Sequence, residues 1–312
     1  MKKSYLISLF LFFLLSPVLS QSRQETILFE QRGYHFPYDV NRAVKVWEMS
    51  DDLKEISALT YLDDHLLATL QDEKGKIYIY NTKKEKVVKK IKFAGDGDFE
   101  GVERVEGDLW ALRSDGKLYR IKDYKEKDPK IKKYETGFSA KNNTEGLGYD
   151  PATEKLLIAC KGYPFPERED RWEGREFKSV YSFDLKEKKL DKEPFLLIAL
   201  DSIKDHRDYN TLTRWGIELL AYLDEDEGDV SFQPSGVAVH PQSGNIYVLA
   251  SVGKILAVFS PEKEMLALVE LDGKVHRQPE GICFGPDGTL YISNEGHDHK
   301  GKIRRFEKIV KR

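Results

Sequence analysis

Three glutamates recur in the same short string along this chain, and their spacing suggests that they share a site. Glu100, Glu145 and Glu280 each stand directly before a glycine and an apolar residue. The string has serine instead of glutamate at Ser235, and a weaker copy begins at Ser57. The four clear copies begin 45, 90 and 45 residues apart. A structural repeat of about 45 residues would therefore bring these carboxylates together.

Carboxylates that converge in a small space repel one another unless a cation or a basic side chain neutralises them. Ca²⁺ binds oxygen ligands, and we expect Glu100, Glu145 and Glu280 to hold it at the mouth of a central channel. The alternative is structural, with each carboxylate accepting hydrogen bonds from backbone amides of its own or the next repeat. Two of the five repeats have a serine, Ser57 or Ser235, in place of the glutamate. The number of protein ligands to the ion therefore stays open. The glycine after each glutamate should allow a close backbone approach.

The same strand pattern follows each string, and it identifies the repeat. A short apolar strand is followed by a turn, a second strand such as Lys155–Cys160 and a third such as Lys302–Phe306. A fourth strand ends most copies, as in Val87–Phe93. Four antiparallel strands in 40–45 residues are typical of a β-propeller blade. We predict an all-β fold, a five-bladed β-propeller, with a sandwich of accidental spacing as the alternative.

The last repeat lacks a fourth strand, and a lone strand at Ala43–Met49 can supply it and close the ring. The predicted propeller domain therefore spans residues 43–312. It carries insertions at 161–178 and 201–229, and the second resembles an amphipathic helix more than strands. A six-bladed ring is the alternative, in which a degenerate blade lies within the long gap between the third and fourth strings.

Strand geometry places charged residues and both insertions on one rim. In an antiparallel blade, the start of the inner strand, the turn after the second strand and the connection to the next blade share a face. Long loops at one end of a rigid scaffold are common binding sites. The candidate ligand-binding residues on this rim are Asp72, Arg113, Lys161 and Glu295.

The first residues have the features of a secretory signal peptide. A basic start precedes an apolar run, and small side chains precede Gln21, so residues 1–20 are expected to be removed and 21–42 to form an N-terminal extension. No later segment is apolar enough to span a membrane. The chain of 312 residues has 50 basic and 53 acidic residues and a net charge of −3. This balance argues against a nucleic-acid partner.

Other chemical motifs are weak. The two cysteines, Cys160 and Cys283, lie in apolar strand patterns, and we expect buried thiols rather than a disulfide. His297 and His299 lie in a glycine-bounded loop that is typical of a solvated turn. Catalytic residues stay unknown at this stage, because no nucleophile and base can be paired from the spacing.

Several strings together resemble the SdiA-regulated family. They include Phe99–Val102, Asn143–Leu147, Pro234–Ala238 and Gln278–Ile282, and the resemblance runs from about Val46 to Phe306. It implies a five-bladed propeller, distantly similar to NHL-repeat proteins, with a bound calcium ion. It implies no established reaction.

Two functions follow as expectations. The first is an exported, periplasmic or extracellular, calcium-binding scaffold that binds a small molecule, glycan or protein on its loop-rich face. The second is a calcium-dependent hydrolase, similar to lactonases or phosphoesterases, with the metal at the channel mouth. In the second, Glu295, His297 or His299 would transfer protons.

Overall fold

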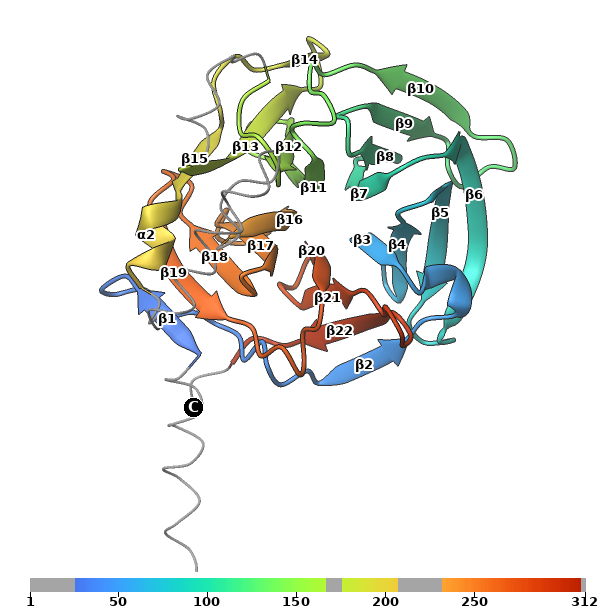
Figure 1. Ribbon diagram of the computed structural model, residues 1–312. Helices are drawn as coiled ribbons and strands as arrows, with labels where there is room; N and C mark the ends of the chain where they lie inside the picture. The colour runs from blue at the N-terminus through green and yellow to red at the C-terminus, as the bar shows by residue number, and fades with distance from the viewer. Residues whose placement is uncertain (1–25, 167–175, 207–231, 310–312) are drawn as a thin grey trace, which may run out of the picture.

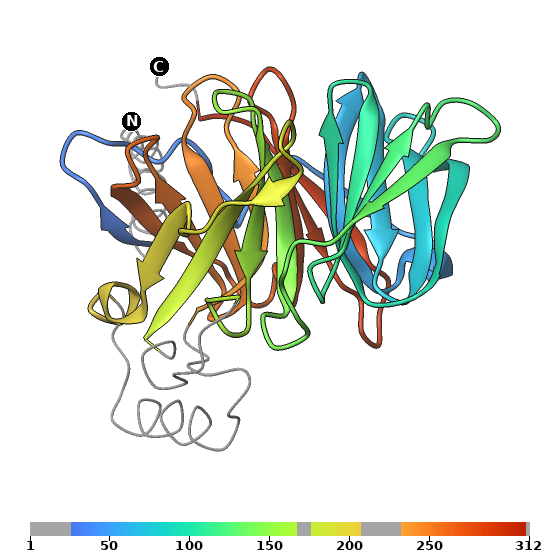
Figure 2. The same ribbon diagram turned by 90° about the horizontal axis from the view of Figure 1, so that it is seen from above.

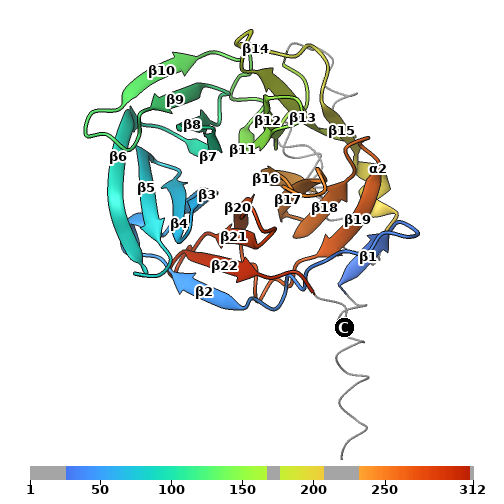
Figure 3. The same ribbon diagram turned by 180° about the vertical axis from the view of Figure 1, so that it is seen from behind.

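Five antiparallel sheets stand around a central axis (Figure 1). The computed structural model describes residues 26–166, 176–206 and 232–309. Each sheet is one blade, and the first strand of each blade lies next to the axis in views from both ends (Figures 1 and 3). The five-bladed prediction is confirmed, and the six-bladed alternative is wrong for the described part of the chain. The predicted signal peptide lies outside these residues.

The blades follow one another along the chain. Blade one contains β3 (Ile56–Asp63), β4 (Leu66–Gln71), β5 (Lys74–Asn81) and β6 (Lys86–Asp96). Blade two contains β7 (Phe99–Val105), β8 (Asp108–Arg113), β9 (Leu118–Lys122) and β10 (Lys130–Tyr134). Blade three contains β11 (Thr144–Asp150), β12 (Lys155–Cys160) and β13 (Phe177–Asp184), with β14 (Lys189–Leu190) and β15 (Leu196–Ala199) both paired to β13.

The last two blades each take a strand from the N-terminal part of the chain. Blade four contains β16 (Gln233–Val239), β17 (Ile246–Val252), β18 (Ile255–Phe259), β19 (Met265–Glu270) and, at its edge, β1 (Ile27–Glu30). Blade five contains β20 (Pro279–Phe284), β21 (Leu290–Asn294), β22 (Lys302–Phe306) and β2 (Lys45–Glu48). The pairing of β2 with β22 confirms that the lone strand closes the ring.

Helix is scarce in the described ranges. A 3₁₀ turn, η1 (Asp51–Leu53), precedes blade one, and a five-residue helix, α2 (Leu200–Lys204), follows β15. The side view shows α2, in gold, at one of the two faces of the disc (Figure 2). The rest of the expected insertion, residues 207–229, lies outside the described residues. No helix in the described part of the chain is both long and apolar enough to cross a bilayer.

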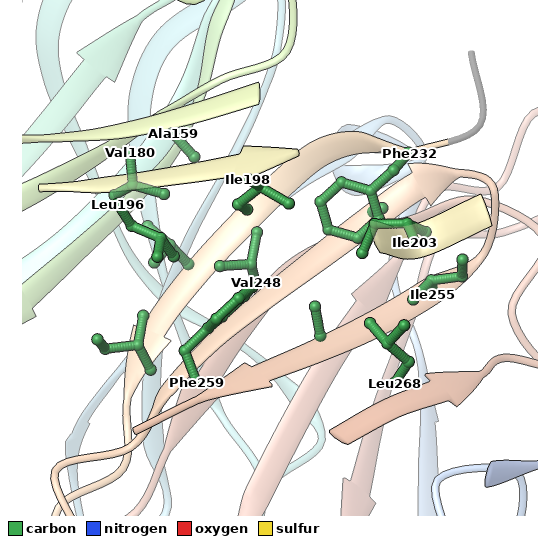
Figure 4. Packing of buried hydrophobic residues seen from close by; sticks show 14 of the residues in the cluster. Ala159, Val180, Leu196, Ile198, Ile203, Phe232, Val248, Ile255, Phe259 and Leu268 are labelled. Atoms are coloured by element: carbon green, nitrogen blue, oxygen red, sulfur yellow. The ribbon is translucent and has the colours of Figure 1, made fainter. Parts of the chain in front are cut away.

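Apolar side chains fill the spaces between neighbouring blades. Each of five buried clusters joins two adjacent sheets. Between blades three and four, Val180 and Ile198 face Val248 and Phe259, and Ile203 of α2 covers one end (Figure 4). A middle strand such as β12 therefore has apolar neighbours on both faces, which explains its unbroken apolar run.

The outer strands have a different composition because one edge faces solvent. The strand β6 carries three exposed lysines and buries Ile91 and Phe93, and β10 is rich in exposed lysine. Charged residues on an edge strand discourage pairing with another chain. The composition of β6 and β10 thus protects the outer edges of blades one and two.

The described part of the N-terminal extension packs on the propeller. Phe36, Tyr38 and Val40 are buried in the cluster between blades four and five. The hydroxyl of Tyr38 donates a hydrogen bond to the carbonyl of Gly288 (2.6 Å). The ring nitrogen Nε2 of the fully buried His276 lies 2.8 Å from the carbonyl oxygen of Val40. Residues 26–42 are therefore part of the fold.

Both cysteines are buried and free, as expected. Burial raises the pKa of the Cys160 thiol to about 12 and that of Cys283 well above its usual range. These thiols stay protonated at neutral pH, so they act as small apolar side chains.

Candidate functional site

A backbone bulge occurs at the same place in all five inner strands, and it positions the candidate ligands. In β7, Phe99 pairs with Arg113 and Gly101 with Leu112, so Glu100 has no partner in the ladder. The same register shift occurs in the other four inner strands. A bulge places two residues of one strand opposite one of its partner and redirects the side chain. The bulges span Ser57, Glu100, Glu145, Ser235 and Glu280.

Four of these residues, all except Ser57, line one small cavity on the axis. Glu100, Glu145 and Glu280 line it together with the glycines and apolar residues that follow the bulges. Its volume is about 10 Å³, close to that of one water-sized sphere. The structure therefore brings together three glutamates that lie up to 180 residues apart in the sequence.

The glycines beside the glutamates allow the inner strands to approach one another. A Cβ placed on Gly101 would lie 2.5 Å from the Cβ of Leu147, in the next blade. A Cβ on Gly146 would lie 2.9 Å from the amide nitrogen of Val237. Real Cβ atoms do not approach other atoms this closely, so the expected structural role of these glycines agrees with the packing.

The two serines in the ring join neighbouring blades. Ser57 donates a hydrogen bond to the carbonyl of Phe99 (2.8 Å), and Ser235 donates to the carbonyl of Pro279 (2.8 Å). Both acceptors belong to the next inner strand around the ring. The serines thus hold blade one to blade two and blade four to blade five.

Burial and mutual repulsion disfavour the ionised form of two of the glutamates. Burial, with a smaller contribution from the charge of Glu145, raises the pKa of Glu280 to about 8. The same two causes raise the pKa of Glu100 well above the usual range of a glutamate. Both glutamates also repel each other. The channel mouth is therefore a place where positive charge is stabilised.

Lys161 supplies positive charge in the described structure. Its ammonium nitrogen lies 2.7 Å from Oε1 of the buried Glu145. Burial alone would lower the pKa of Lys161, but the three glutamates outweigh burial and raise that pKa. Its position is fixed further because Lys178 donates a hydrogen bond to the carbonyl of Lys161 (2.5 Å).

A second set of polar side chains stands two positions before the glutamates. Asn143 donates a hydrogen bond to Oε1 of Glu145 (3.3 Å). A hydrogen bond from Gln278 lowers the pKa of Glu280, whereas one with Asp98 raises the pKa of Glu100. Sequence analysis missed these residues. The repeat contained a signal for them, because a polar residue stands two positions before each of the five bulge residues. These polar residues are Glu55, Asp98, Asn143, Gln233 and Gln278.

The glutamate carboxylates are the kind of ligand that a hard cation binds, although they do not lie close enough together to coordinate one. Carboxylate oxygens are among the ligands that Ca²⁺ prefers, and three glutamates line the axial cavity. Among the described residues, no group of three or more His, Cys, Asp or Glu side chains is close enough to hold a metal ion. Calcium binding would therefore require the carboxylates to move closer together and Lys161 to release Glu145.

The four candidate rim residues lie at the ends of second strands, but they differ in their partners. Burial raises the pKa of Asp72 to about 6, with the charges of Glu55 and Glu295 contributing. Glu295 accepts a hydrogen bond from Gln278. Arg113, in contrast, is bound to Asp115, with Nε 2.9 Å from Oδ1. Lys161 and Glu295 thus act on the glutamates of the channel mouth. Asp72 interacts with Glu55 and Glu295, and Arg113 is engaged in its own turn.

The His297 loop lies nearer the site than its sequence indicated. Nε2 of His297 contacts Oε1 of Gln278, and Nδ1 lies 3.7 Å from Oε1 of Glu295. The ring is largely exposed. Gln278 therefore connects this histidine with both Glu295 and Glu280.

Comparison with solved structures identifies the fold. The glutaminyl cyclase from Myxococcus xanthus shares 10% identity at a TM-score of 0.54, covering 87% of this chain and 97% of the cyclase. A luciferin-regenerating enzyme shares 12% identity at a TM-score of 0.49, with coverages of 84% and 94%. A catalytically inactive virginiamycin B lyase from Staphylococcus aureus with quinupristin shares 14% identity at a TM-score of 0.44, with coverages of 81% and 69%. At such identities the likeness shows the fold alone.

Sequence comparison identifies the family. No curated protein matches the chain with significance. A family profile described as SdiA-regulated matches residues 33–212, which is more than half of the chain and runs from the N-terminal extension past blade three. The matched region contains the bulged strands of Glu100 and Glu145 and their polar neighbours. The chain belongs to the SdiA-regulated family.

Proposed function

We propose that this protein is a calcium-binding propeller that binds a ligand on the rim around its channel mouth. The observation that carries the proposal is the meeting of Glu100, Glu145 and Glu280 at one end of the axis, each on a bulge of a different blade. Burial and mutual repulsion make Glu100 and Glu280 costly to ionise when no cation is bound. A divalent cation would relieve their repulsion more fully than one lysine can.

The three glutamates would hold the ion through carboxylate oxygens, with Gln278 and Asn143 orienting Glu280 and Glu145. When bound, calcium supplies a fixed positive charge that attracts anionic groups and polarises them. Lys161 is the internal competitor for the same carboxylates, because its ammonium group is bound to Glu145. Lys161→Met is therefore expected to tighten calcium binding, since it removes that competitor.

Calorimetric titration of the chelator-treated protein with calcium chloride tests the site. We expect saturable binding and a rise of several degrees in Tm, because an ion that binds only the folded state stabilises it. Glu100→Gln and Glu280→Gln should weaken binding at least tenfold. Glu187→Gln, an exposed carboxylate in the turn after β13 at the opposite face, is the control and should bind like the wild type. Absence of binding at millimolar calcium, with an unchanged Tm, would refute the proposal.

A hydrolase is the second candidate, and the contact between His297 and Gln278 favours it. This contact places the imidazole of His297 beside Glu295 and against Gln278. Gln278 also forms a hydrogen bond with Glu280. A histidine at this place could accept a proton from water or donate one to a leaving group. We expect Glu295 to hold the imidazole in its orientation, and Lys161 to attract the negatively charged part of a substrate.

Turnover of lactones and phosphomonoesters with added calcium distinguishes the two functions. A hydrolase should lose activity in both Glu100→Gln and His297→Gln, and retain it in His65→Gln, whose histidine lies in the turn between β3 and β4 at the opposite face. If no substrate is turned over while calcium still binds, the scaffold function stands and the hydrolase is excluded for those substrates.

We further propose that the protein is exported, to the periplasm or the extracellular space, after removal of residues 1–20. The basic, apolar and small-residue regions of the N-terminus support this proposal. Removal would take away two lysines and no acidic residue, so the net charge would change from −3 to −5. N-terminal sequencing of the protein expressed in a secreting host should begin at Gln21. An intact Met1 in the soluble cell fraction would contradict export.

A further inference from the structure

A basic hollow lies on the rim, beside the glutamates but distinct from them. Its volume is about 440 Å³, and the residues that matter here are Lys161, Ser251, Lys254, Arg277 and Gln278. Three of its lining residues are basic and none is acidic. This is unusual in a chain whose net charge is −3. Binding cavities for small molecules commonly have volumes of about 300–1,000 Å³.

Three consecutive blades contribute to the basic hollow. Lys161 follows β12 in blade three, and Ser251 and Lys254 come from the end of β17 and the turn after it in blade four. Arg277 and Gln278 come from the connection between β19 and β20, which leads into blade five. These blades are neighbours around the ring (Figure 1).

Two of the three cations are held in place by the surrounding chain. Nζ of Lys254 donates a hydrogen bond to the carbonyl of Arg277 (2.6 Å). Its side chain also passes over Gly273, where an added Cβ would lie 3.3 Å from Cε of Lys254. Lys161 is held by Glu145 at 2.7 Å. Cations that are already positioned lose little conformational entropy when an anion binds between them.

A second hollow of nearly equal size has the opposite charge. Asp72, Glu73, Asp96 and Asp98 line it with a single lysine, Lys74, and its volume is about 450 Å³. It belongs to blade one and the entry to blade two, and the strand topology puts it on the same face as the basic hollow. The rim is therefore divided by charge, which favours a ligand with a defined orientation.

We propose that the basic hollow binds the oxyanion of a small molecule, a phosphate or a carboxylate, between Lys254 and Arg277. Arg277 is exposed at the wall of the hollow, and its planar guanidinium can bind two oxyanion oxygens. The Ser251 hydroxyl and the Gln278 amide are neutral donors at the same wall. Lys161 lies between this site and Glu145, so the remainder of the ligand would extend towards the channel mouth.

The size of the basic hollow favours a whole metabolite over a free inorganic ion. A volume of about 440 Å³ exceeds that of a single phosphate and suits a molecule as large as a monosaccharide phosphate. This inference rests on the proposed ligand-binding rim, and it names the class of ligand. It does not require calcium, because the basic residues attract an anion whether or not the glutamates hold an ion.

Titration of the calcium-free protein with inorganic phosphate, glucose 6-phosphate, glucuronate and glucose tests the proposal. We expect at least one of the three anions to bind and glucose not to bind, and the comparison of phosphate with carboxylate identifies the oxyanion. Binding should weaken as salt is added, because the attraction is between charges. Failure of all three anions to bind at millimolar concentration would overturn the proposal.

Charge-removing variants locate the site. Arg277→Gln changes an exposed side chain and should weaken anion binding about tenfold or more without changing the Tm. Lys254→Gln should have a similar effect on binding. Lys84→Gln is the matched control, because Lys84 is exposed in the turn between β5 and β6 at the opposite face. Wild-type affinity in Arg277→Gln, or equal weakening in Lys84→Gln, would overturn the assignment.

Glu280→Gln separates this inference from the calcium proposal. We expect this variant to bind calcium at least tenfold more weakly and to keep its affinity for the anion. Anion binding without calcium binding in the wild type would refute the calcium proposal alone. Calcium binding without anion binding would refute the basic hollow alone.

Discussion

At the scale of single residues, the glutamates at the channel mouth lower the stability of the folded state. Glu280 is buried, and burial with the nearby charge of Glu145 raises its pKa to about 8. Lys161 offsets part of that cost through its ion pair with Glu145. Side chains that cost stability in the folded state are common where a protein binds a ligand.

Glu280→Gln should stabilise the calcium-free protein at pH 8 and have little effect below about pH 4.5. Between these pH values the folded state holds a proton on Glu280 that the unfolded state releases, so wild-type stability falls as pH rises. Glutamine keeps the size of the side chain and does not titrate. Chemical denaturation of both proteins should give a difference on the order of a few kcal/mol at pH 8. Parallel pH profiles would contradict a raised pKa for Glu280.

At the scale of elements, the five bulges and the glycines beside them turn five ordinary inner strands into a site. The bulge directs the ring residue, and the glycine allows the neighbouring strand to approach. Blade one departs from this pattern, because Ala58 stands where Gly101, Gly146, Gly236 and Gly281 stand in the other blades. Four of the five inner strands therefore share the glycine at this position, and blade one accommodates a methyl group there.

Gly101→Ala should destabilise the protein by about 1–3 kcal/mol, the usual cost of inserting a methyl group into a packed interior. Its Cβ would lie 2.5 Å from the Cβ of Leu147 and 2.9 Å from that of Leu112. Gly107→Ala is the matched control, because a Cβ at this turn between β7 and β8 would meet nothing within 4 Å. Equal unfolding free energies of the two variants would show that the inner strands are not tightly packed.

At the scale of the whole molecule, the N-terminal region secures the ring at two places. The strand β2 completes blade five, and the indole nitrogen of Trp47 donates a hydrogen bond to the carbonyl of Thr82 in blade one (3.1 Å). Earlier in the chain, β1 and the residues after it cover blades four and five. Closure of the ring leaves no inner sheet edge exposed.

Trp47→Ala should therefore cost about 3–5 kcal/mol, as truncation of a large buried aromatic residue usually does. Trp47 is 5% exposed and packs in the cluster that joins blades five and one. Thermal unfolding measures the loss, and Val46→Ala, at an exposed position on the opposite side of the same strand, is the control. A change in Tm no larger than that of the control would argue against a closing role for this strand.

His276 should make the attachment of the N-terminal segment sensitive to acid. Burial lowers the pKa of His276 to about 4, whereas an unfolded histidine titrates near 6.5. Between pH 6.5 and pH 4 the unfolded state binds the additional proton, so stability is lost as the pH falls through this range. The loss amounts to about 3 kcal/mol for a shift of this size.

Chemical denaturation between pH 4 and pH 7 tests this dependence. His276→Gln should show a shallower fall in stability than the wild type, and His35→Gln, at an exposed position, should follow the wild type. Burial also lowers the pKa of His240 to about 4, so part of the pH dependence should persist in His276→Gln. An unchanged pH profile in His276→Gln would exclude the role of His276.

Much of the fold could be predicted from sequence because a propeller repeats one local pattern. The strands Lys155–Cys160 and Lys302–Phe306 were predicted at their observed bounds, and the closing strand was predicted within Ala43–Met49. The strand β13 begins at Phe177, so it includes the last two residues of the expected insertion at 161–178. Strand β1 was missed, because a short strand that pairs only with a distant edge has no repeat to reveal it.

For the site, the sequence by itself determined which residues share the axis, because equal spacing within a repeat gives equal positions in each blade. Only the tertiary structure decided the charge balance around them. Lys161 turns towards Glu145, whereas Arg113, also at the end of a second strand, turns towards Asp115. Lys254 and Arg277 meet through the connections of different strands. Such contacts depend on side-chain direction and on loops that differ between repeats, so they cannot be predicted from residue spacing.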